Sequence, residues 1–211
     1  MKSDSQANHA YHEIRRNILT AQLPPGVRLK EDYWAGKLDV GRMAVREALT
    51  RLLGEGLVEL GERGGYYATE MTPEDVRQIR ELREVLELAA VRLAAGRITE
   101  AQLARLDDIC RDFSSLVQKG YVAGACEADI RFHETLLAAS GNRRLLQAYH
   151  YAHIPLFHQK LGKTRTYLED YDQTDREHRL IVEALRNKDL ALAEQTLRNH
   201  FKRGETAVLD L

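Results

Sequence analysis

The 211-residue chain contains little cysteine, proline or aromatic side chain, with two Cys, four Pro and 7% Phe, Trp and Tyr together. Cys110 and Cys126 stand too far apart for a zinc knuckle or a redox CxxC pair, and we expect both to be small buried residues. No apolar run approaches the length of a membrane span, and the first residues lack the apolar core of a signal peptide. We therefore expect a cytoplasmic protein with no membrane partner.

The chain also lacks an excess of charge of either sign, since 31 Lys and Arg stand against 32 Asp and Glu. Proteins that bind nucleic acid depend on a basic surface, so any DNA contact here must come from local clustering. Residues 41–52 contain such a cluster, in which Arg42, Arg46 and Arg51 accompany the acid Glu47. The excess of positive charge is modest.

The N-terminal third has the pattern of a winged helix-turn-helix. Apolar spacing predicts three helices, over residues 9–22, 30–38 and 42–55. In the second helix we expect Tyr33, Trp34 and Leu38 to face the core. Two short runs rich in β-formers flank a Gly-rich turn at 61–65, which predicts a hairpin. A fold of this kind presents its third helix to the DNA major groove.

The rest of the chain predicts helices almost throughout. Their expected ranges are 73–95, 99–118, 122–140, 142–161, 169–187 and 189–208. Thr72 and Pro73 are typical of a helix start, and Pro155 should kink the fourth of these helices. The predicted fold is mainly α: a winged helix-turn-helix domain over residues 1–71 and a six-helix antiparallel bundle over 72–211.

Two arginines on the third predicted helix are candidate DNA contacts. Arg42 and Arg46 lie four residues apart and so share one face of that helix. Because the N-terminal end of a recognition helix usually reaches the bases, Arg42 is the favoured base reader, and Arg46 would contact either a base or a phosphate. Arg63, before Gly64 at the hairpin tip, would reach a phosphate or the minor groove. The alternative is that these arginines are ordinary solvated side chains.

Three histidines and an aspartate form a candidate metal site. Asp129 and His133 share one helix face, and His178 and His200 each lie on a later helix. Three imidazoles and a carboxylate suit zinc, nickel, manganese or iron. The alternative is that the histidines are separate surface or packed residues. His150, His153 and His158, on the fourth bundle helix, are expected mainly at the surface.

Two stretches carry a resemblance to a known family. Residues 11–70 resemble the N-terminal domain of GntR-type bacterial transcription regulators, through the motifs Val45-Arg46-Glu47-Ala48-Leu49, Glu55-Gly56-Leu57-Val58 and Arg63-Gly64. Residues 73–209 look like the helical FCD domain of the FadR-like subfamily, in its shorter VanR-like branch. The resemblance implies DNA contacts from Arg42, Met43, Arg46, Arg63 and Gly64. The chain departs from the family at Gly41, Met43 and Ala44, where Ser, Thr and Pro are usual, and this removes polar DNA contacts.

The same resemblance implies a sensor. It assigns Asp129, His133, His178 and His200 as ligands of a divalent transition metal, zinc or nickel foremost. It also places Arg83 against an acidic effector, whereas the residues alone equally allow a solvent-facing pair with Glu87 four positions on. The implied function is a metabolite-responsive regulator, most simply a repressor, that binds an inverted-repeat operator as a homodimer and senses a small carboxylate.

Two other classes of function remain open. One is a metal-dependent hydrolase or lyase that uses the Asp/His cluster, although the chain contains no HExxH motif and a winged helix would be idle in such an enzyme. The other is a DNA-binding architectural protein whose bundle is inert. We expect a regulator and not an enzyme.

Overall fold

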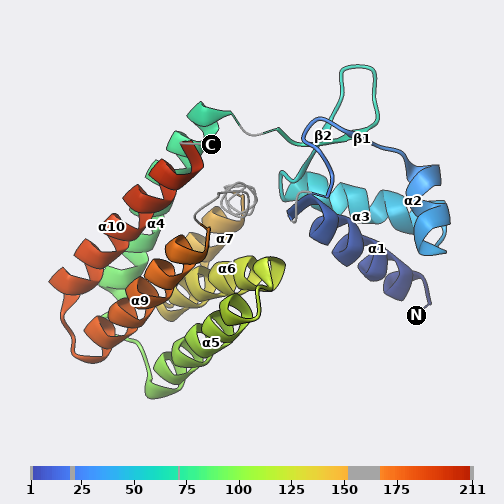
Figure 1. Ribbon diagram of the computed structural model, residues 1–211. Helices are drawn as coiled ribbons and strands as arrows, with labels where there is room; N and C mark the ends of the chain where they lie inside the picture. Colours follow the sequence, from blue (N-terminus) through green and yellow to red (C-terminus); the bar gives the residue numbers. More distant parts are fainter. Residues whose placement is uncertain (1, 20–21, 71, 152–166, 210–211) are drawn as a thin grey trace.

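The computed structural model of the chain describes residues 2–19, 22–70, 72–151 and 167–209. It is mainly helical and has two parts (Figure 1). The N-terminal part contains α1 (Lys2–Leu19), β1 (Arg28–Leu29), α2 (Glu31–Leu38), α3 (Arg42–Gly54), β2 (Val58–Leu60) and β3 (Tyr66–Ala68). The C-terminal part contains α4 (Pro73–Ala94), α5 (Glu100–Gln118), α6 (Val122–Ala139), α7 (Arg143–Tyr151), α9 (Tyr167–Arg186) and α10 (Leu190–Leu209). The predicted fold class is confirmed. His153, Pro155 and His158 lie outside the described residues.

The turn between α2 and α3 depends on backbone conformation more than on side-chain caps. Asp39 ends α2 in the left-handed region at φ 53°. Gly41, the N-cap of α3, has no side chain to cap the helix, and its N–H donates to Gln6 Oε1 at 3.5 Å. At the other end of α3, Gly56 adopts φ 67°, and the Leu57 N–H donates to the carbonyl of Leu52 at 3.0 Å. This left-handed glycine ends the helix as the sequence predicts.

In the N-terminal part, one local prediction is wrong and one strand was not predicted. Tyr33 is 59% exposed, because Trp34 occupies the buried stripe of α2 and its neighbour is rotated about 100° around the helix. The wing also has a strand that the periodicity does not reveal. Its sheet has the order β1-β3-β2, all antiparallel, and β1 is only two residues long. A strand of that length shows no alternation.

Helix α4 connects the two hydrophobic cores. Its start is fixed by a capping box, in which the Asp75 N–H donates to Thr72 Oγ1 at 3.1 Å and the Thr72 N–H donates to Asp75 Oδ2 at 2.8 Å. Val76, on its first turn, is buried in the N-terminal core with Ile18, Trp34 and others. Leu88, three turns later, packs in the core of the helical part. One continuous helix therefore spans both parts.

The C-terminal part is a bundle around a core from α4, α5, α6, α9 and α10. Thr99 and Gln102 form a second capping box, at the start of α5. Cys110 and Cys126 are both buried, as expected. Among the described residues, no helix combines the length and the apolar character needed to cross a membrane.

Candidate metal centre and nucleic-acid interface

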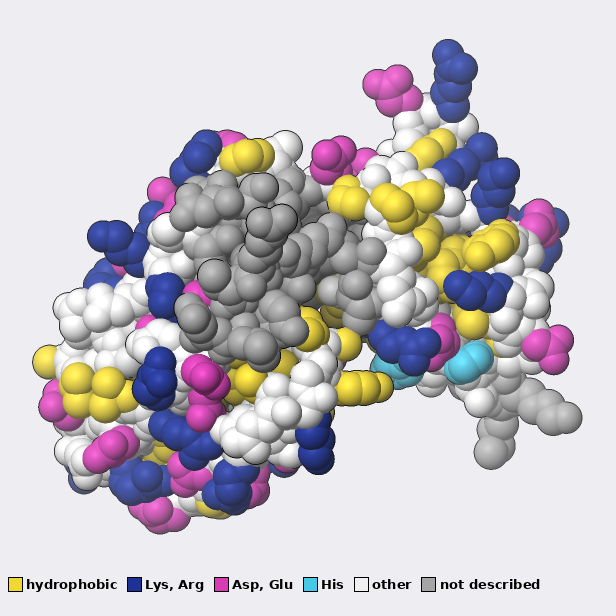
Figure 2. Space-filling model, viewed as in Figure 1, with side chains coloured by type: hydrophobic (Ala, Val, Ile, Leu, Met, Phe, Trp, Pro, Cys, Tyr) yellow, Lys and Arg dark blue, Asp and Glu magenta, His cyan; other side chains and the backbone are white. Residues whose placement is uncertain are grey.

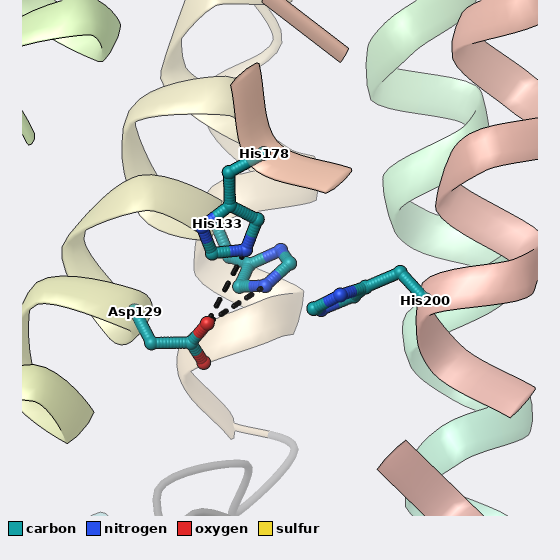
Figure 3. Close-up of side chains that lie close together, drawn as sticks. All are labelled: Asp129, His133, His178 and His200. Atoms are coloured by element: carbon teal, nitrogen blue, oxygen red, sulfur yellow. Dashed lines mark ion pairs between the residues drawn. The ribbon is translucent and has the colours of Figure 1, made fainter. Parts of the chain in front are cut away.

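The structure brings the four candidate metal ligands together in the middle of the bundle. Asp129 and His133 project from successive turns of α6, His178 from α9 and His200 from α10, and all four are buried (Figure 3). Each offers one ligand atom, and these atoms all lie within 4.8 Å of one another. We call this group the Asp/His cluster.

Within the cluster, Asp129 faces two imidazoles. Its Oδ1 lies 3.3 Å from Nε2 of His178 and 3.8 Å from Nε2 of His133. The ring of His178 stacks on Phe132 with 3.8 Å between centroids, which fixes its plane. Burial lowers the pKa of His178 well below its usual value, although Asp129 opposes the shift. His178 is therefore neutral and keeps a lone pair for a metal.

Two further carboxylates orient the cluster from outside. Glu87 Oε2 lies 2.5 Å from Nδ1 of His133, and Glu177 Oε2 lies 2.9 Å from Nδ1 of His200. A carboxylate at Nδ1 holds the ring in place and leaves Nε2 for a metal. Burial acts to raise the pKa of Glu177, but hydrogen bonds from His200 and Arg203 outweigh it and lower the pKa to about 2.

Sequence reasoning missed the role of both outer carboxylates. The sequence suggests for Glu87 only a solvent-facing pair with Arg83, and it suggests no role for Glu177. Glu177 lies next to a candidate ligand in sequence, yet it serves the histidine on α10. The arrangement of three imidazoles, one carboxylate and outer hydrogen-bond acceptors fits a divalent transition metal. The buried Asp/His cluster can hold such an ion.

The candidate DNA contacts lie at the surface of the N-terminal part. The side chains of Arg42 and Arg46 are 61% and 52% exposed, and Met43 is 71% exposed. Arg63 and Gly64 are exposed at the wing tip, where Gly64 adopts φ 78°. In Figure 2, Lys and Arg side chains lie over this part with Asp and Glu among them, which agrees with the modest charge excess in the sequence.

A groove joins the third helix to the wing. Its volume is about 510 Å³, and its lining includes Arg42 and Arg46 from α3, Gly65 and Tyr66 from the wing, and the first turn of α2. Both arginines pair with acids on that turn, a contact that sequence reasoning missed. Arg42 Nε lies 2.8 Å from Asp32 Oδ1, and Arg46 Nε donates to Glu31 Oε1 at 2.9 Å.

Comparisons with known proteins agree with this architecture. A family model described as "Bacterial regulatory proteins, gntR family" matches residues 6–67, and one described as "FCD domain" matches residues 78–203, more than half of the chain. The chain belongs to the GntR family. It is a transcription regulator of the GntR type with an FCD domain, and proteins with this helix-turn-helix bind DNA.

Individual relatives of this GntR-family regulator are also transcription regulators. It is 28% identical to the HTH-type transcriptional regulator YdhC of Bacillus subtilis, over 90% of this chain and 85% of that protein. It is 29% identical to the HTH-type transcriptional repressor RspR of Escherichia coli, over 60% and 55% of the two chains. Its fold is similar to that of E. coli McbR/YncC, with a TM-score of 0.82, 20% identity and 97% of each chain covered. The hydrolase or lyase alternative is therefore not supported.

The predicted effector arginine of the GntR-family regulator is buried beside the cluster. Arg83 is 2% exposed and lines a cavity of about 30 Å³ together with Asp129 and His200. Its Nε donates to Glu87 Oε1 at 3.1 Å. The two alternatives for Arg83 were a position facing an effector cavity and a solvent-facing pair with Glu87. The structure has features of both, because Arg83 lines a cavity and also pairs with Glu87, but this pair is buried.

Proposed function

We infer that the protein is a metabolite-responsive repressor that acts as a homodimer on an inverted-repeat operator in the cytoplasm. Residues 1–71 would bind DNA and residues 72–211 would sense a small carboxylate and form the dimer. The observation that carries this proposal is the buried Asp/His cluster beside Arg83, in a chain that also has a DNA-binding part. The repressor named RspR among its relatives supports the sign of regulation.

In this proposal Asp129, His133, His178 and His200 hold a divalent metal, zinc or nickel. Such an ion, when bound, supplies a Lewis-acidic anchor for a carboxylate oxygen. The chain's own residues supply the rest. Glu87 and Glu177 hold His133 and His200 at Nδ1, and Arg83 faces the same cavity with a guanidinium suited to the second carboxylate oxygen.

The cavity limits the ligand that can enter without rearrangement. A volume of about 30 Å³ holds about two water molecules, so an organic acid must displace side chains. Arg83, Glu87 and His133 form a continuous chain of contacts. A carboxylate that draws Arg83 toward itself would weaken its pair with Glu87, and Glu87 in turn holds His133. The effector and the metal would then depend on each other's presence.

A second chain of contacts leads from the sensor to the DNA-binding part. Arg15 on α1 pairs with Glu127 on α6, two residues before the cluster residue Asp129. The same arginine lies 3.5 Å from Glu55, the residue that caps α3. A shift of α6 would therefore reach the third helix through Arg15. Ligands shift such an equilibrium only as far as they bind one arrangement better than the other.

DNA binding by this chain would involve Arg42, Met43, Arg46, Arg63 and Gly64. One such surface alone would bind weakly, and two copies related by two-fold symmetry match an inverted repeat. Arg42 is the first residue of α3 and its side chain is mostly exposed, which supports a DNA contact. Met43 would offer only apolar contact where the family usually has Thr.

The deciding experiment measures both the metal content of the protein and the release of operator DNA by an organic acid. Protein purified without chelator should contain about one equivalent of zinc or nickel per chain by elemental analysis, and chelation should lower its melting temperature. A DNA duplex selected from a random pool should then be released on adding an organic acid found by thermal-shift screening. Less than about half an equivalent of metal, with no stabilisation by added metal, would contradict the sensor.

A further inference from the structure

The pair between Arg46 and Glu31 joins the third helix to the first turn of α2 by two parallel hydrogen bonds. Arg46 Nε donates to Glu31 Oε1 at 2.9 Å, and its Nη2 donates to Glu31 Oε2 at 3.0 Å. The carboxylate is the more enclosed partner, because the Glu31 side chain is 17% exposed and the Arg46 side chain 52%. A sheltered acid therefore holds an outward-facing arginine.

This contact leaves a defined edge of the guanidinium for other partners. A guanidinium has five N–H groups in a rigid plane and presents two edges that each donate a pair of bonds. Glu31 takes the edge made by Nε and Nη2. The edge made by Nη1 and Nη2 remains, and a pair of parallel donors matches O6 and N7 of guanine in the major groove. Hydrogen bonds from Arg46 lower the pKa of Glu31, so the carboxylate is charged at neutral pH.

The neighbouring arginine lacks this arrangement. Arg42 meets Asp32 at 2.8 Å, but both side chains are mostly exposed, at 61% and 73%. Its distance to Glu31 Oε2 is 3.7 Å. Exposed pairs of this kind contribute little and break easily, so Arg42 can turn toward a phosphate at low cost.

We propose that Glu31 is a specificity-determining residue of the DNA-binding surface: it orients the outer edge of Arg46 toward a base and cancels that arginine's attraction to phosphates. The inference rests on the proposed DNA contact of Arg46. A neutral pair adds little to sequence-independent binding, which comes from phosphate neutralisation, yet it keeps the donors that read a base. Glu31 thus weakens binding to arbitrary DNA more than binding to the operator.

The test compares a random-sequence duplex with a duplex selected from a random pool by the wild-type protein. Glu31→Gln removes the charge, and Glu31→Asp keeps the charge but shortens its reach. Glu59→Gln is the matched control. Glu59 is exposed on β2, and the substitution removes the same charge from the same part of the protein. Fluorescence anisotropy at several salt concentrations gives the affinity and its salt dependence.

For Glu31→Gln we expect tighter binding to the random duplex. The slope of log Kd against log salt concentration should be steeper by about one. The ratio of the affinities for the selected and the random duplex should fall about tenfold. Glu31→Asp should keep the wild-type slope and still lose discrimination. Glu59→Gln should retain wild-type discrimination. If Glu31→Gln discriminates like the wild type, or Glu31→Asp loses nothing, the inference is wrong.

The variant Arg46→Ala distinguishes a failure of this inference from a failure of the proposed DNA contact. If Arg46→Ala binds both duplexes like the wild type, Arg46 does not contact DNA, and the proposed contact and the inference both fail. If Arg46→Ala loses affinity while Glu31→Gln behaves like the wild type, only the inference fails. The random-duplex measurement needs no operator, so it still decides the salt-slope prediction when selection yields no preferred sequence.

Discussion

The two parts of the protein use charge in opposite ways. In the N-terminal part, Arg42 and Arg46 are more than half exposed, and their acidic partners lie on the rim of an open groove. In the C-terminal part, Arg83 and Glu87 are 2% and 0% exposed and pair with each other, and Glu87 also contacts the buried His133. Exposed pairs are screened by salt and exchange partners readily, whereas buried pairs are costly to break.

This difference matches the tasks that we propose. A DNA-binding surface must leave its arginines available to phosphates and bases. The exposed pair of Arg42 with Asp32 is weak enough to open, and the pair of Arg46 with Glu31 leaves one edge of the guanidinium outward. A sensor must hold one geometry until a ligand arrives, and buried hydrogen-bonded charges do this because any misplacement leaves a charge without compensation. The experiments below test this contrast, beginning with the largest expected effect.

Breaking the buried pair should cost the most stability. Glu87→Ala removes the carboxylate that holds Arg83 and His133, and we expect the free energy of unfolding to fall by about 3–5 kcal/mol in urea denaturation. The control is Glu81→Ala on the same helix, whose side chain is 66% exposed and lies 3.8 Å from Arg80. It should cost under about 1 kcal/mol. Equal losses in the two variants would show that the buried pair is not special.

Loss of one cluster histidine should abolish the stabilisation by metal. At a metal concentration of about 100 times Kd, the wild-type protein should gain roughly 2.7 kcal/mol, and His178→Ala should gain almost none. His150→Ala is the control, because His150 is about half exposed on α7 and faces Glu134 at 3.2 Å, outside the cluster. Differential scanning fluorimetry with and without metal measures both increments. A full metal increment in His178→Ala would remove His178 from the ligand set.

The sequence predicts the helices and the cluster for a physical reason. Capping boxes, helix-ending glycines and the four-residue spacing of Asp129 and His133 are local patterns, and local patterns act within one or two turns. The contacts that the sequence did not reveal join elements that are distant in the chain. The contacts of Glu87 with His133 and of Glu31 with Arg46 depend on how helices pack, and neither leaves a periodic signal. β1 is missed because its two residues pair with β3, far along the chain.

On the exposed surface, Arg42→Ala should affect DNA binding without affecting the fold. If Arg42 reads a base, its loss should cost about 1–3 kcal/mol of binding free energy at one base pair of the operator. If it contacts a phosphate, the loss should be equal across all operator variants, and the salt slope should fall by about one. Affinity measured against a set of single-base operator variants separates the two results. The weaker, exposed pair with Asp32 favours the phosphate contact.

We expect the smallest change in stability when the contact between the two parts is broken. The same change is the most informative about coupling between them. Arg15→Gln removes the contacts with Glu127 on α6 and Glu55 at the end of α3, and we expect a loss of about 1 kcal/mol in the free energy of unfolding. The effect of metal or organic acid on DNA affinity should fall much further, because the shift of α6 then no longer reaches α3 through a charged contact. Arg16→Gln is the matched control, since Arg16 pairs with Glu13 one turn away on the same helix. If Arg15→Gln retains the full response of DNA affinity to metal and acid, the signal passes through α4, which packs in both cores.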